Sequence, residues 1–492
     1  MATETMTKRG PTLPSRRYAP AALPVLFLLA CAGNPDEGEA GAGGEPAAAS
    51  TGTASATEST EARTGPARVS SSHYLQLLPE GETKRRFILD CTGCHVFDAA
   101  VAFPEGAPRS RRSWAERTAQ MVGLFGEGTG FPVVSGDRDP EATAAWLARA
   151  VRSAPAPAPT VRLPEGASIE EFPYPPEGDL PHDLVVDGRG RVTITGMFTH
   201  RLWTLDPATG AFAEEPIDAG GAAANPRAID IDAEGGVWVV LGAPTTVARR
   251  DPASGGWTSW QVGMYPHSIA LDGEGRAWFN GHFTRDPPRW GYVRAGDPDV
   301  VTFDVPVTPE LARGNGPMPY GLRVAPDGAV WGTELIGNRL IRFRPEDADF
   351  ATWDMPTPHS GPRRPDVGPD GVVWVPAYAS NRLARFDPAT REFTEYPLPV
   401  PDALPYVVRV DNTRGTVWIG TNAADAVFSF DPATERFTTY TLPTAGALVR
   451  HIDVDEETGE VWAAYGASPG IQAKIARIRP PNATPRPGPT AG

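Results

Sequence analysis

Two cysteines and a histidine lie close together in the first quarter of the chain, as Cys91, Cys94 and His95. The C-x-x-C-H spacing is typical of covalent haem attachment, in which both thiols bond to the porphyrin and the histidine binds the iron. A structural zinc site would need four ligands, and a chain with only 3 cysteines has no second cysteine pair. A thioredoxin-type dithiol would need a preceding strand and would leave His95 without a role. The motif therefore predicts one covalent haem c.

The sixth position on the iron has two candidate ligands. Met121 is the only methionine between residues 7 and 196, and a thioether ligand on the far side of the haem raises its potential. Packing in a helical core beside Trp114 would explain Met121 equally well. His73 is a weaker candidate because it borders a segment that we expect to be flexible. Met121 is therefore predicted as a tentative iron ligand.

The third cysteine, Cys31, ends an N-terminal segment that is typical of export. Basic residues before position 18 precede the apolar run "ALPVLFLLAC", which has the length of a signal-peptide core and is too short to span a bilayer. Leu28–Cys31 resembles the bacterial lipobox, in which the cysteine is lipidated and becomes the first mature residue. A plain secretory signal with a chance cysteine is the alternative. Residues 1–31 thus predict an exported lipoprotein, anchored to a bacterial membrane on the periplasmic side or at the cell surface.

Charge and composition narrow the fold and the function. The chain has 45 Lys and Arg against 60 Asp and Glu, a net charge of −15, which argues against nucleic acid as a partner. Its 52 Gly and 54 Pro require frequent turns and favour many short strands over long helices. We therefore expect a mainly β protein.

The first third of the chain divides by composition into three segments. Residues 32–72 are rich in Ala, Gly, Thr, Ser and Glu and predict a disordered tether. Residues 73–153 predict a small all-α domain, in which Ser113–Glu116 has capping-box spacing and Asp139 precedes a Pro at the first helical position. Residues 154–166 contain alternating Ala and Pro and predict a stiff linker.

The remainder, residues 167–479, is repetitive, and residues 480–492 predict a flexible tail. Each repeat has four short strand signals and most carry one tryptophan, at intervals of 40 to 53 residues that suit a propeller blade. The equivalent positions are Thr193, Trp238, Trp278, Trp331, Trp374, Trp418 and Trp462. Seven repeats predict a seven-bladed β-propeller, with a stacked solenoid as the alternative. The seventh repeat lacks its fourth strand, and Glu170–Pro175 matches that strand, so we expect this segment to close the ring.

Two resemblances to known families follow from these residues. The stretch from "LPEGETKRRFILDCTGCH" through "SWAERTAQM" to "DPEATAAWLARAV" resembles a short class-I-type cytochrome c domain. The repeats resemble the streptogramin B lyase (virginiamycin B lyase) family, through phrases such as "PHSIALDGEGRAWF", "MPYGLRVAPDGAVWGTE" and "NRLARFDPATREFTEYPLP". The combination of both parts resembles a group of exported bacterial proteins that are usually labelled lyase-like.

The residue after the opening proline of each repeat, or its equivalent, should start an innermost strand and face the central channel. Together these residues form an expected ring of basic and aromatic side chains: His182, Arg227, His267, Tyr320, Arg363, Tyr406 and Arg450. Three residues at the ends of second strands should reach the same channel mouth: Glu334, His282 and Tyr378. Such a cluster suits an anionic or aromatic ligand or an acidic docking partner, and we expect this mouth to be the functional surface. A water-filled rim whose residues bond one another is the alternative.

The catalytic set that the lyase resemblance implies is incomplete. That family uses a Pro-His segment, then Glu-Pro-His in the next blade and a second Glu fourteen residues later. His182 and His267 match the histidines but lie two repeats apart, and Leu180, Tyr265, Gly196 and Gly281 stand at the glutamate positions. We therefore expect electron transfer through haem to an exported redox partner. The alternatives are a Mg²⁺-assisted lyase or a hydrolase with a regulatory haem, and a non-catalytic binding scaffold.

Overall fold

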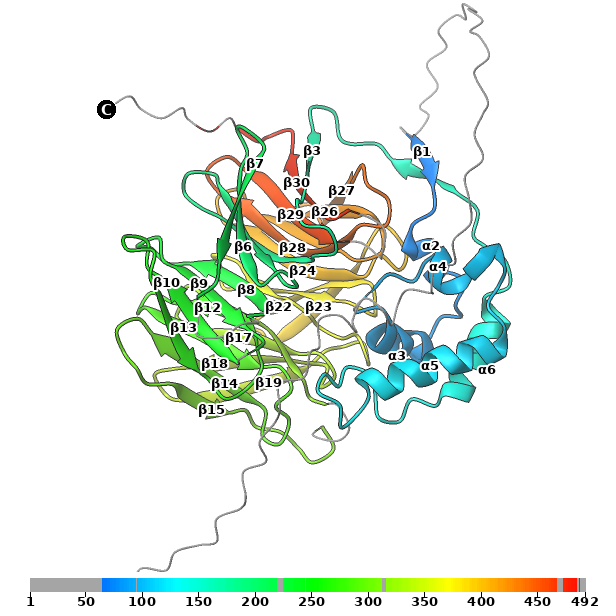
Figure 1. Cartoon of the computed structure of the whole chain (residues 1–492), viewed down its shortest axis with the longest axis horizontal. Helices are drawn as coiled ribbons and strands as arrows, with labels where there is room; N and C mark the ends of the chain where they lie inside the picture. Colours follow the sequence, from blue (N-terminus) through cyan, green and yellow to red (C-terminus); the bar gives the residue numbers. More distant parts are fainter. Residues whose placement is uncertain are drawn as a thin grey trace, which may run out of the picture. The chain divides into compact units, whose positions relative to one another are not determined.

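The computed structural model describes residues 64–93, 95–218, 224–243, 245–311, 316–466, 472–484 and 486. The described residues between 168 and 479 include seven four-stranded antiparallel sheets (Figure 1). The innermost strand of each sheet contacts the innermost strands of both neighbouring sheets, and the last contacts the first. The ring is therefore closed. This confirms the predicted seven-bladed β-propeller and excludes the open solenoid.

Each blade places its strands in chain order from the channel outwards. The first three blades contain β4 (Pro181–Val186), β5 (Val192–Gly196), β6 (Arg201–Asp206) and β7 (Ala211–Pro216); β8 (Pro226–Ile231), β9 (Val237–Leu241), β10 (Thr246–Arg250) and β11 (Trp257–Gln261); β12 (Pro266–Leu271), β13 (Arg276–Gly281), β14 (Arg289–Arg294) and β15 (Val301–Asp304). The next three contain β16 (Pro319–Val324), β17 (Val330–Glu334), β18 (Arg339–Arg344) and β19 (Asp349–Asp354); β20 (Asp366–Val367), β21 (Val373–Ala377), β22 (Arg382–Asp387) and β23 (Glu392–Pro397); β24 (Pro405–Asp411), β25 (Thr416–Thr421), β26 (Ala426–Asp431) and β27 (Arg436–Thr441).

The seventh blade is completed from the N-terminal side. Its first three strands are β28 (Leu448–Asp455), β29 (Glu460–Gly466) and β30 (Lys474–Arg479), and its outermost strand is β3 (Ser168–Pro173). The carboxylate of Glu171 on β3 accepts hydrogen bonds from Tyr465 (2.5 Å) and from Lys474 (2.6 Å). The predicted closure is thus confirmed, and it removes the open sheet edge that an incomplete blade would expose.

The repeated tryptophans pack inside the blades, as their spacing predicts. All six lie on the second strand of a blade and are buried. In two blades the indole N–H also has a carboxylate partner, since Trp238 donates to Asp232 (2.8 Å) and Trp278 to Asp272 (2.7 Å). The first blade has Thr193 at this place and fills its interior with other side chains, among them Ile194 and Leu205.

Short helices precede the propeller. They are α2 (Ser71–Leu75), α3 (Glu82–Cys91), α4 (Ala99–Ala102), the 3₁₀ turn η1 (Pro104–Gly106), α5 (Arg111–Phe125) and α6 (Pro140–Ala150). The start of α6 is as predicted, with Asp139 accepting from the backbone of the first turn and Pro140 at the first position. The expected start at Ser113 is wrong: α5 begins at Arg111 because Ser110 caps it and accepts from the Ser113 N–H. No described helix is long and apolar enough to cross a membrane.

The tether and the linker differ from the sequence-based expectation where they pair with each other. The last residues of the predicted tether form β1 (Thr64–Arg68) and the start of α2, and β1 pairs antiparallel with β2 (Ala158–Val161) of the predicted Pro-rich linker. A two-stranded pairing between segments so far apart in the chain leaves no local sequence signal. Residues 32–63 of the tether lie outside the described residues.

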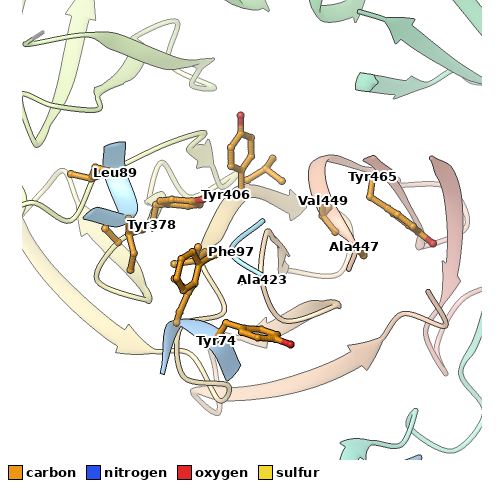
Figure 2. Close-up of a cluster of buried hydrophobic side chains, with 14 of the residues drawn as sticks. Tyr74, Leu89, Phe97, Tyr378, Tyr406, Ala423, Ala447, Val449 and Tyr465 are labelled. Atoms are coloured by element: carbon orange, nitrogen blue, oxygen red, sulfur yellow. The ribbon is translucent and has the colours of Figure 1, made fainter. Parts of the chain in front are cut away.

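The helices pack against one end of the propeller through a shared core. One cluster of buried residues includes Leu89 and Phe97 from the helical part and Tyr378 and Tyr406 from the propeller (Figure 2). At its border the Lys84 ammonium donates to the Asp402 carboxylate (2.7 Å), and both side chains are buried. Burial raises the pKa of the Asp402 carboxyl, although the nearby Lys84 ammonium acts in the opposite direction. Because both charges are buried, each is stabilised by the other rather than by water.

Removal of Lys84 should therefore destabilise the protein. In Lys84→Ala the carboxylate of Asp402 stays buried without its cation, and we expect a loss of about 3 kcal/mol in the free energy of unfolding, measured by chemical denaturation. Arg112→Ala is the matched control, because Arg112 forms an exposed pair with Glu116 and should leave the denaturation curve unchanged. Equal stability of Lys84→Ala and the wild type would show that the docking contact carries no energy.

Candidate functional site

The residues that open the seven innermost strands converge in the channel, as expected. All seven side chains are buried: His182, Arg227, His267, Tyr320, Arg363, Tyr406 and Arg450. Contacts between them cross from blade to blade, because the innermost strands lie around one narrow axis. The structure therefore brings together residues that are up to 268 positions apart in the sequence.

Tyrosines and arginines form the centre of this ring. The hydroxyls of Tyr320 and Tyr406 are hydrogen-bonded (2.6 Å), and Arg363 donates to the Tyr320 hydroxyl (2.7 Å). The guanidinium carbon of Arg363 also lies 3.9 Å from the centre of the Tyr378 ring, while Arg450 donates to the Tyr406 hydroxyl (3.3 Å). Tyrosine faces and hydroxyls thus take the place of water around the buried guanidiniums.

Three histidines form the neighbouring side of the ring. The ring centres of His182 and His267 are 6.2 Å apart, and His282 stacks on His267 at 4.5 Å. Burial lowers the pKa of His182 and His267 well below the usual range and lowers that of His282 to about 3. All three are therefore neutral imidazoles at physiological pH.

The charge of the ring centres on Tyr406. Burial alone would raise the pKa of this phenol, but the guanidiniums of Arg450, Arg364 and Arg363 outweigh burial and lower the pKa to about 7. Burial raises the pKa of the bonded partner Tyr320, which therefore keeps its proton. Near neutral pH Tyr320 therefore keeps its proton, and the proton of Tyr406 is the labile one.

The helical part covers this ring. The Tyr378 hydroxyl donates to the Thr92 carbonyl (2.9 Å), and Arg450 donates to the Gly93 carbonyl (2.8 Å). A Cβ atom on Gly93 would lie only 3.1 Å from Nη2 of Arg363, so glycine allows the turn to approach the guanidinium. The channel mouth, which we expected to be the functional surface, is therefore covered by the helical part. The sequence gives no signal for how two parts joined by a linker dock on each other.

A second contact closes the mouth on the opposite side of the ring. Phe131, in the loop between α5 and α6, meets Tyr265 and Phe283 edge to face, with ring centres 5.9 and 4.9 Å apart. The guanidinium carbon of Arg227 lies 5.7 Å from the Phe131 ring and 5.5 Å from the Tyr265 ring. Phe131 of the helical part thus lies at the channel mouth, where we expected an aromatic ligand.

The predicted haem-binding residues lie at this border. Cys91 is the last residue of α3, it is half-buried, and it packs against the shared core. His95 is also half-buried, and its Nδ1 lies 2.9 Å from the Val96 carbonyl oxygen. Cys94 and the predicted lipidation site Cys31 lie outside the described residues.

The two candidate sixth ligands have different surroundings. Met121 lies on α5, half-buried, two turns after the buried Trp114. His73 lies on α2, where its Nδ1 accepts from the Ser70 backbone N–H (3.1 Å) and contacts the Ser70 hydroxyl (2.9 Å). His73 therefore has a local capping role, and Met121 stays the predicted ligand.

Of the three second-strand residues, two reach the ring and one does not. Tyr378 and His282 make the contacts described above. Glu334 is fully buried but pairs with Arg339 of its own blade (2.6 Å), because the two residues stand opposite each other on β17 and β18. Burial raises the pKa of Glu334 to about 7. Its predicted place in the channel mouth is wrong.

A second layer of residues faces the channel and was not predicted from the sequence. In six blades the strand register shifts directly after the opening residue, so two consecutive side chains turn inwards. Asp183 and Arg364 meet in this second layer across the channel, with Nη1 of Arg364 at 2.7 Å from both carboxylate oxygens. Pairs of polar residues after the opening proline, such as His182–Asp183 and Arg450–His451, were the available signal.

The positions of the missing lyase glutamates are sterically closed. A Cβ on Gly196 would lie 2.5 Å from the Asp179 carboxylate, and one on Gly281 would lie 2.7 Å from the Met264 sulfur. Neither position has room for a carboxylate side chain without a rearrangement. Leu180 and Tyr265 likewise offer no carboxylate, so none of the four positions carries the glutamate that the lyase resemblance implies.

Comparisons with known proteins identify the type of propeller. Residues 304–480 match the family model of the virginiamycin B lyase family. Among solved structures, the selenomethionine-substituted virginiamycin B lyase from Staphylococcus aureus covers 64% of this chain and 99% of its own, with 21% identity and a TM-score of 0.55. A search of curated proteins found no match.

Two further structures agree with this result. A catalytically inactive variant of the S. aureus enzyme with quinupristin has 21% identity, a TM-score of 0.56 and the same coverage. A streptogramin B lyase structure has 21% identity and a TM-score of 0.56, and covers 64% of this chain and 97% of its own. At this identity the likeness establishes the fold and not the activity. The chain carries a seven-bladed β-propeller of the virginiamycin B lyase type.

Proposed function

We propose that this protein is an exported, lipid-anchored c-type cytochrome that transfers electrons, and that its propeller holds the haem-attachment turn and binds a small ligand. One observation carries the proposal. The two residues between the cysteines of the C-x-x-C-H motif, Thr92 and Gly93, are hydrogen-bonded by Tyr378 and Arg450 of the propeller channel. A redox motif and a buried ring of titratable residues are thereby in direct contact.

The described residues around the motif fit a covalent haem. The Nδ1–H of His95 can donate to the Val96 carbonyl (2.9 Å), which leaves Nε2 as the lone-pair donor that haem iron requires. Trp114, buried in the same helical core, has an indole N–H without a hydrogen-bond partner among the described residues. Haem carries carboxylates, which are acceptors for such a donor. When bound, haem c supplies one-electron redox chemistry.

The propeller residues would act on the attachment turn as positioning residues. Tyr378 and Arg450 fix the carbonyls of Thr92 and Gly93, which sets the direction in which α3 ends and the backbone towards His95 begins. The Thr92 hydroxyl donates to the Ile88 carbonyl (2.8 Å), so the turn is held from both sides. The shared core excludes water from this face, and the Tyr406 oxygen exchanges a proton near neutral pH beneath the turn.

An exported redox partner protein would meet the helical part rather than the channel mouth. The mouth arginines are buried, whereas Ala99 and Ala100, shortly after the iron ligand His95, are exposed on α4. Small exposed residues allow a partner to approach the haem edge closely. This revises the expected docking of an acidic partner on Arg227 and Arg450.

The alternatives have weaker support. For a Mg²⁺-assisted lyase, Asp183 does lie beside His182 (2.7 Å), but it is paired with Arg364, and among the described residues no group of three or more His, Cys, Asp or Glu is placed to hold a metal ion. A non-catalytic scaffold would not require a labile proton on Tyr406 or a C-x-x-C-H motif. Electron transfer through haem uses the C-x-x-C-H motif.

We predict one covalent haem. Haem staining after denaturing electrophoresis should be positive for the wild type, because thioether bonds survive denaturation, and negative for Cys91→Ala/Cys94→Ala. Cys31→Ala is the matched control and should keep the stain. A stained double variant would refute thioether attachment. In Met121→Ala, an unchanged reduced spectrum and potential would assign Met121 to packing.

We predict that Cys31 carries the lipid. Labelled palmitate should enter the wild type and should be absent from Cys31→Ala, because the thiol is the acceptor in a lipobox. Cys91→Ala should be labelled like the wild type. Equal labelling of Cys31→Ala would point to a plain secretory signal.

We predict a tyrosine that ionises near neutral pH. The tyrosinate absorbance of the wild type, measured as a difference from Tyr406→Phe at each pH, should rise with a midpoint at about pH 7. Below the midpoint the phenol is neutral, and above it the three guanidiniums stabilise the phenolate. Tyr440→Phe, which removes a tyrosine outside the ring, should keep the step. A flat difference up to the usual tyrosine range would mean that burial outweighs the guanidiniums.

A further inference from the structure

The second layer of channel residues surrounds a cavity, which lies below the ring of opening residues. It is partly open to solvent, and its polar lining side chains are Asp183, Ser268, Arg323, Arg364, Arg409 and His451. These side chains come from six blades, and none of them was predicted as a site residue from the sequence. The cavity is separated from the helical part by the ring of opening residues.

Arg364 reaches this cavity with part of its hydrogen-bonding capacity unused. Its Nη1 donates to both oxygens of Asp183 at 2.7 Å. Its Nε and Nη2 have no hydrogen-bond partner among the described residues, although the side chain is only 5% exposed. A buried charged donor without a partner is more costly than a neutral one, so these two N–H groups favour binding of an acceptor.

The geometry of the unused groups defines the kind of acceptor. Nε–H and Nη2–H of a guanidinium point in parallel from one edge and form the fork that matches two oxygens of a planar anion. Asp183 accepts from Nη1 and leaves the Nε–Nη2 edge of the guanidinium open. A carboxylate, or an oxyanion of similar shape such as nitrate, would satisfy both donors at once.

Charge in the channel favours the same class of ligand. The guanidiniums that face the channel outnumber the carboxylates that face it: Arg227, Arg323, Arg363, Arg364, Arg409 and Arg450 against Asp183, Asp230, Asp366 and Asp453. The acids are already engaged, since Asp366 pairs with Arg323 (3.2 Å) and Asp453 lies 3.8 Å from Arg409. A bound anion would reduce the remaining excess of positive charge.

The far end of the channel offers an entrance. The helical part covers the end at Arg363 and Arg450, whereas further along the innermost strands the side chains of Arg323 and Asp453 are 21% and 22% exposed. A small solute can therefore approach Arg364 from the end opposite the haem-attachment turn. The partly exposed pairs at this end carry both signs of charge and present no net barrier to an anion.

We propose that Arg364 binds the carboxylate of a small organic acid, or an equivalent planar oxyanion, inside the propeller channel. The inference rests on the ligand-binding role in the proposed function but not on haem. The site lies directly beneath the ring that holds the Thr92–Gly93 turn, because Arg363 and Arg364 are consecutive residues. It differs from the expected ligand site at the mouth, which the helical part occupies.

The test is calorimetric titration of the full-length holoprotein with formate, with nitrate, sulfate and chloride as comparison anions at equal ionic strength. The wild type should bind formate and nitrate saturably and more tightly than sulfate or chloride. Arg364→Lys keeps the charge but lacks the fork, and should weaken formate binding by about tenfold or more. Arg342→Lys is the matched control, because Arg342 also has a buried unpartnered Nε but stacks on Trp331 and Trp353 away from the channel.

A second variant covers the case in which Arg364→Lys fails to fold. Ala228 lines the cavity without contributing a charge, and Ala228→Leu should weaken formate binding by narrowing the space. The haem-free Cys91→Ala/Cys94→Ala variant should bind formate like the wild type, so that failure of the haem proposal and failure of this site can be told apart. Equal affinity for formate and chloride, or equal affinity in Arg364→Lys and Arg342→Lys, would overturn the proposal.

Discussion

The structure depends on closing seven blades around an axis so narrow that side chains from opposite blades touch. Arg364 of the fifth blade and Asp183 of the first form an ion pair across the channel, with 2.7 Å between nitrogen and oxygen. The register shift after the opening residue doubles the number of inward side chains. The channel therefore has to accommodate many guanidiniums without water, and it does so with tyrosine hydroxyls, aromatic faces, a few aspartates and the carbonyls of another part of the chain.

Those carbonyls explain why the helical part docks where it does. Arg450 and Tyr378 would be left with unsatisfied donors if the channel mouth were dry and uncovered, and the Thr92–Gly93 turn supplies two acceptors. Leu89 adds apolar contact, since a Cβ on Gly361 would lie 2.1 Å from its Cδ2, and Gly361 has φ of +61°. The hydrogen bonds to the Thr92–Gly93 turn and the close packing of Leu89 on Gly361 thus favour the same position of the helical part on the propeller.

Much of this could be predicted from the sequence, because periodic features carry local signals. Tryptophan spacing and turn prolines indicated seven blades, and the orphan segment at Glu170–Pro175 indicated the closing strand. The ring from His182 to Arg450 followed from one position per repeat. Docking and the pairing of β1 with β2 depend on tertiary contacts between distant positions, which no periodic pattern encodes. The Glu334–Arg339 pair is local to the β17–β18 hairpin, but the repeat pattern does not say whether Glu334 faces the channel or this neighbour. The second inward layer had a weak signal in its consecutive polar residues.

The consecutive arginines Arg363 and Arg364 connect the covered channel mouth with the cavity in the second layer. Arg363 lies against Gly93 and donates to Tyr320, while Arg364 pairs with Asp183 and borders the cavity. They are consecutive on a short backbone segment between Pro362 and Pro365. Both also act on Tyr406, whose ionisation they favour together with Arg450. An anion bound at Arg364 would compete electrostatically with the Tyr406 phenolate and would therefore raise the pKa of Tyr406. By linkage, protonation of Tyr406 would in turn strengthen binding of the anion in the cavity.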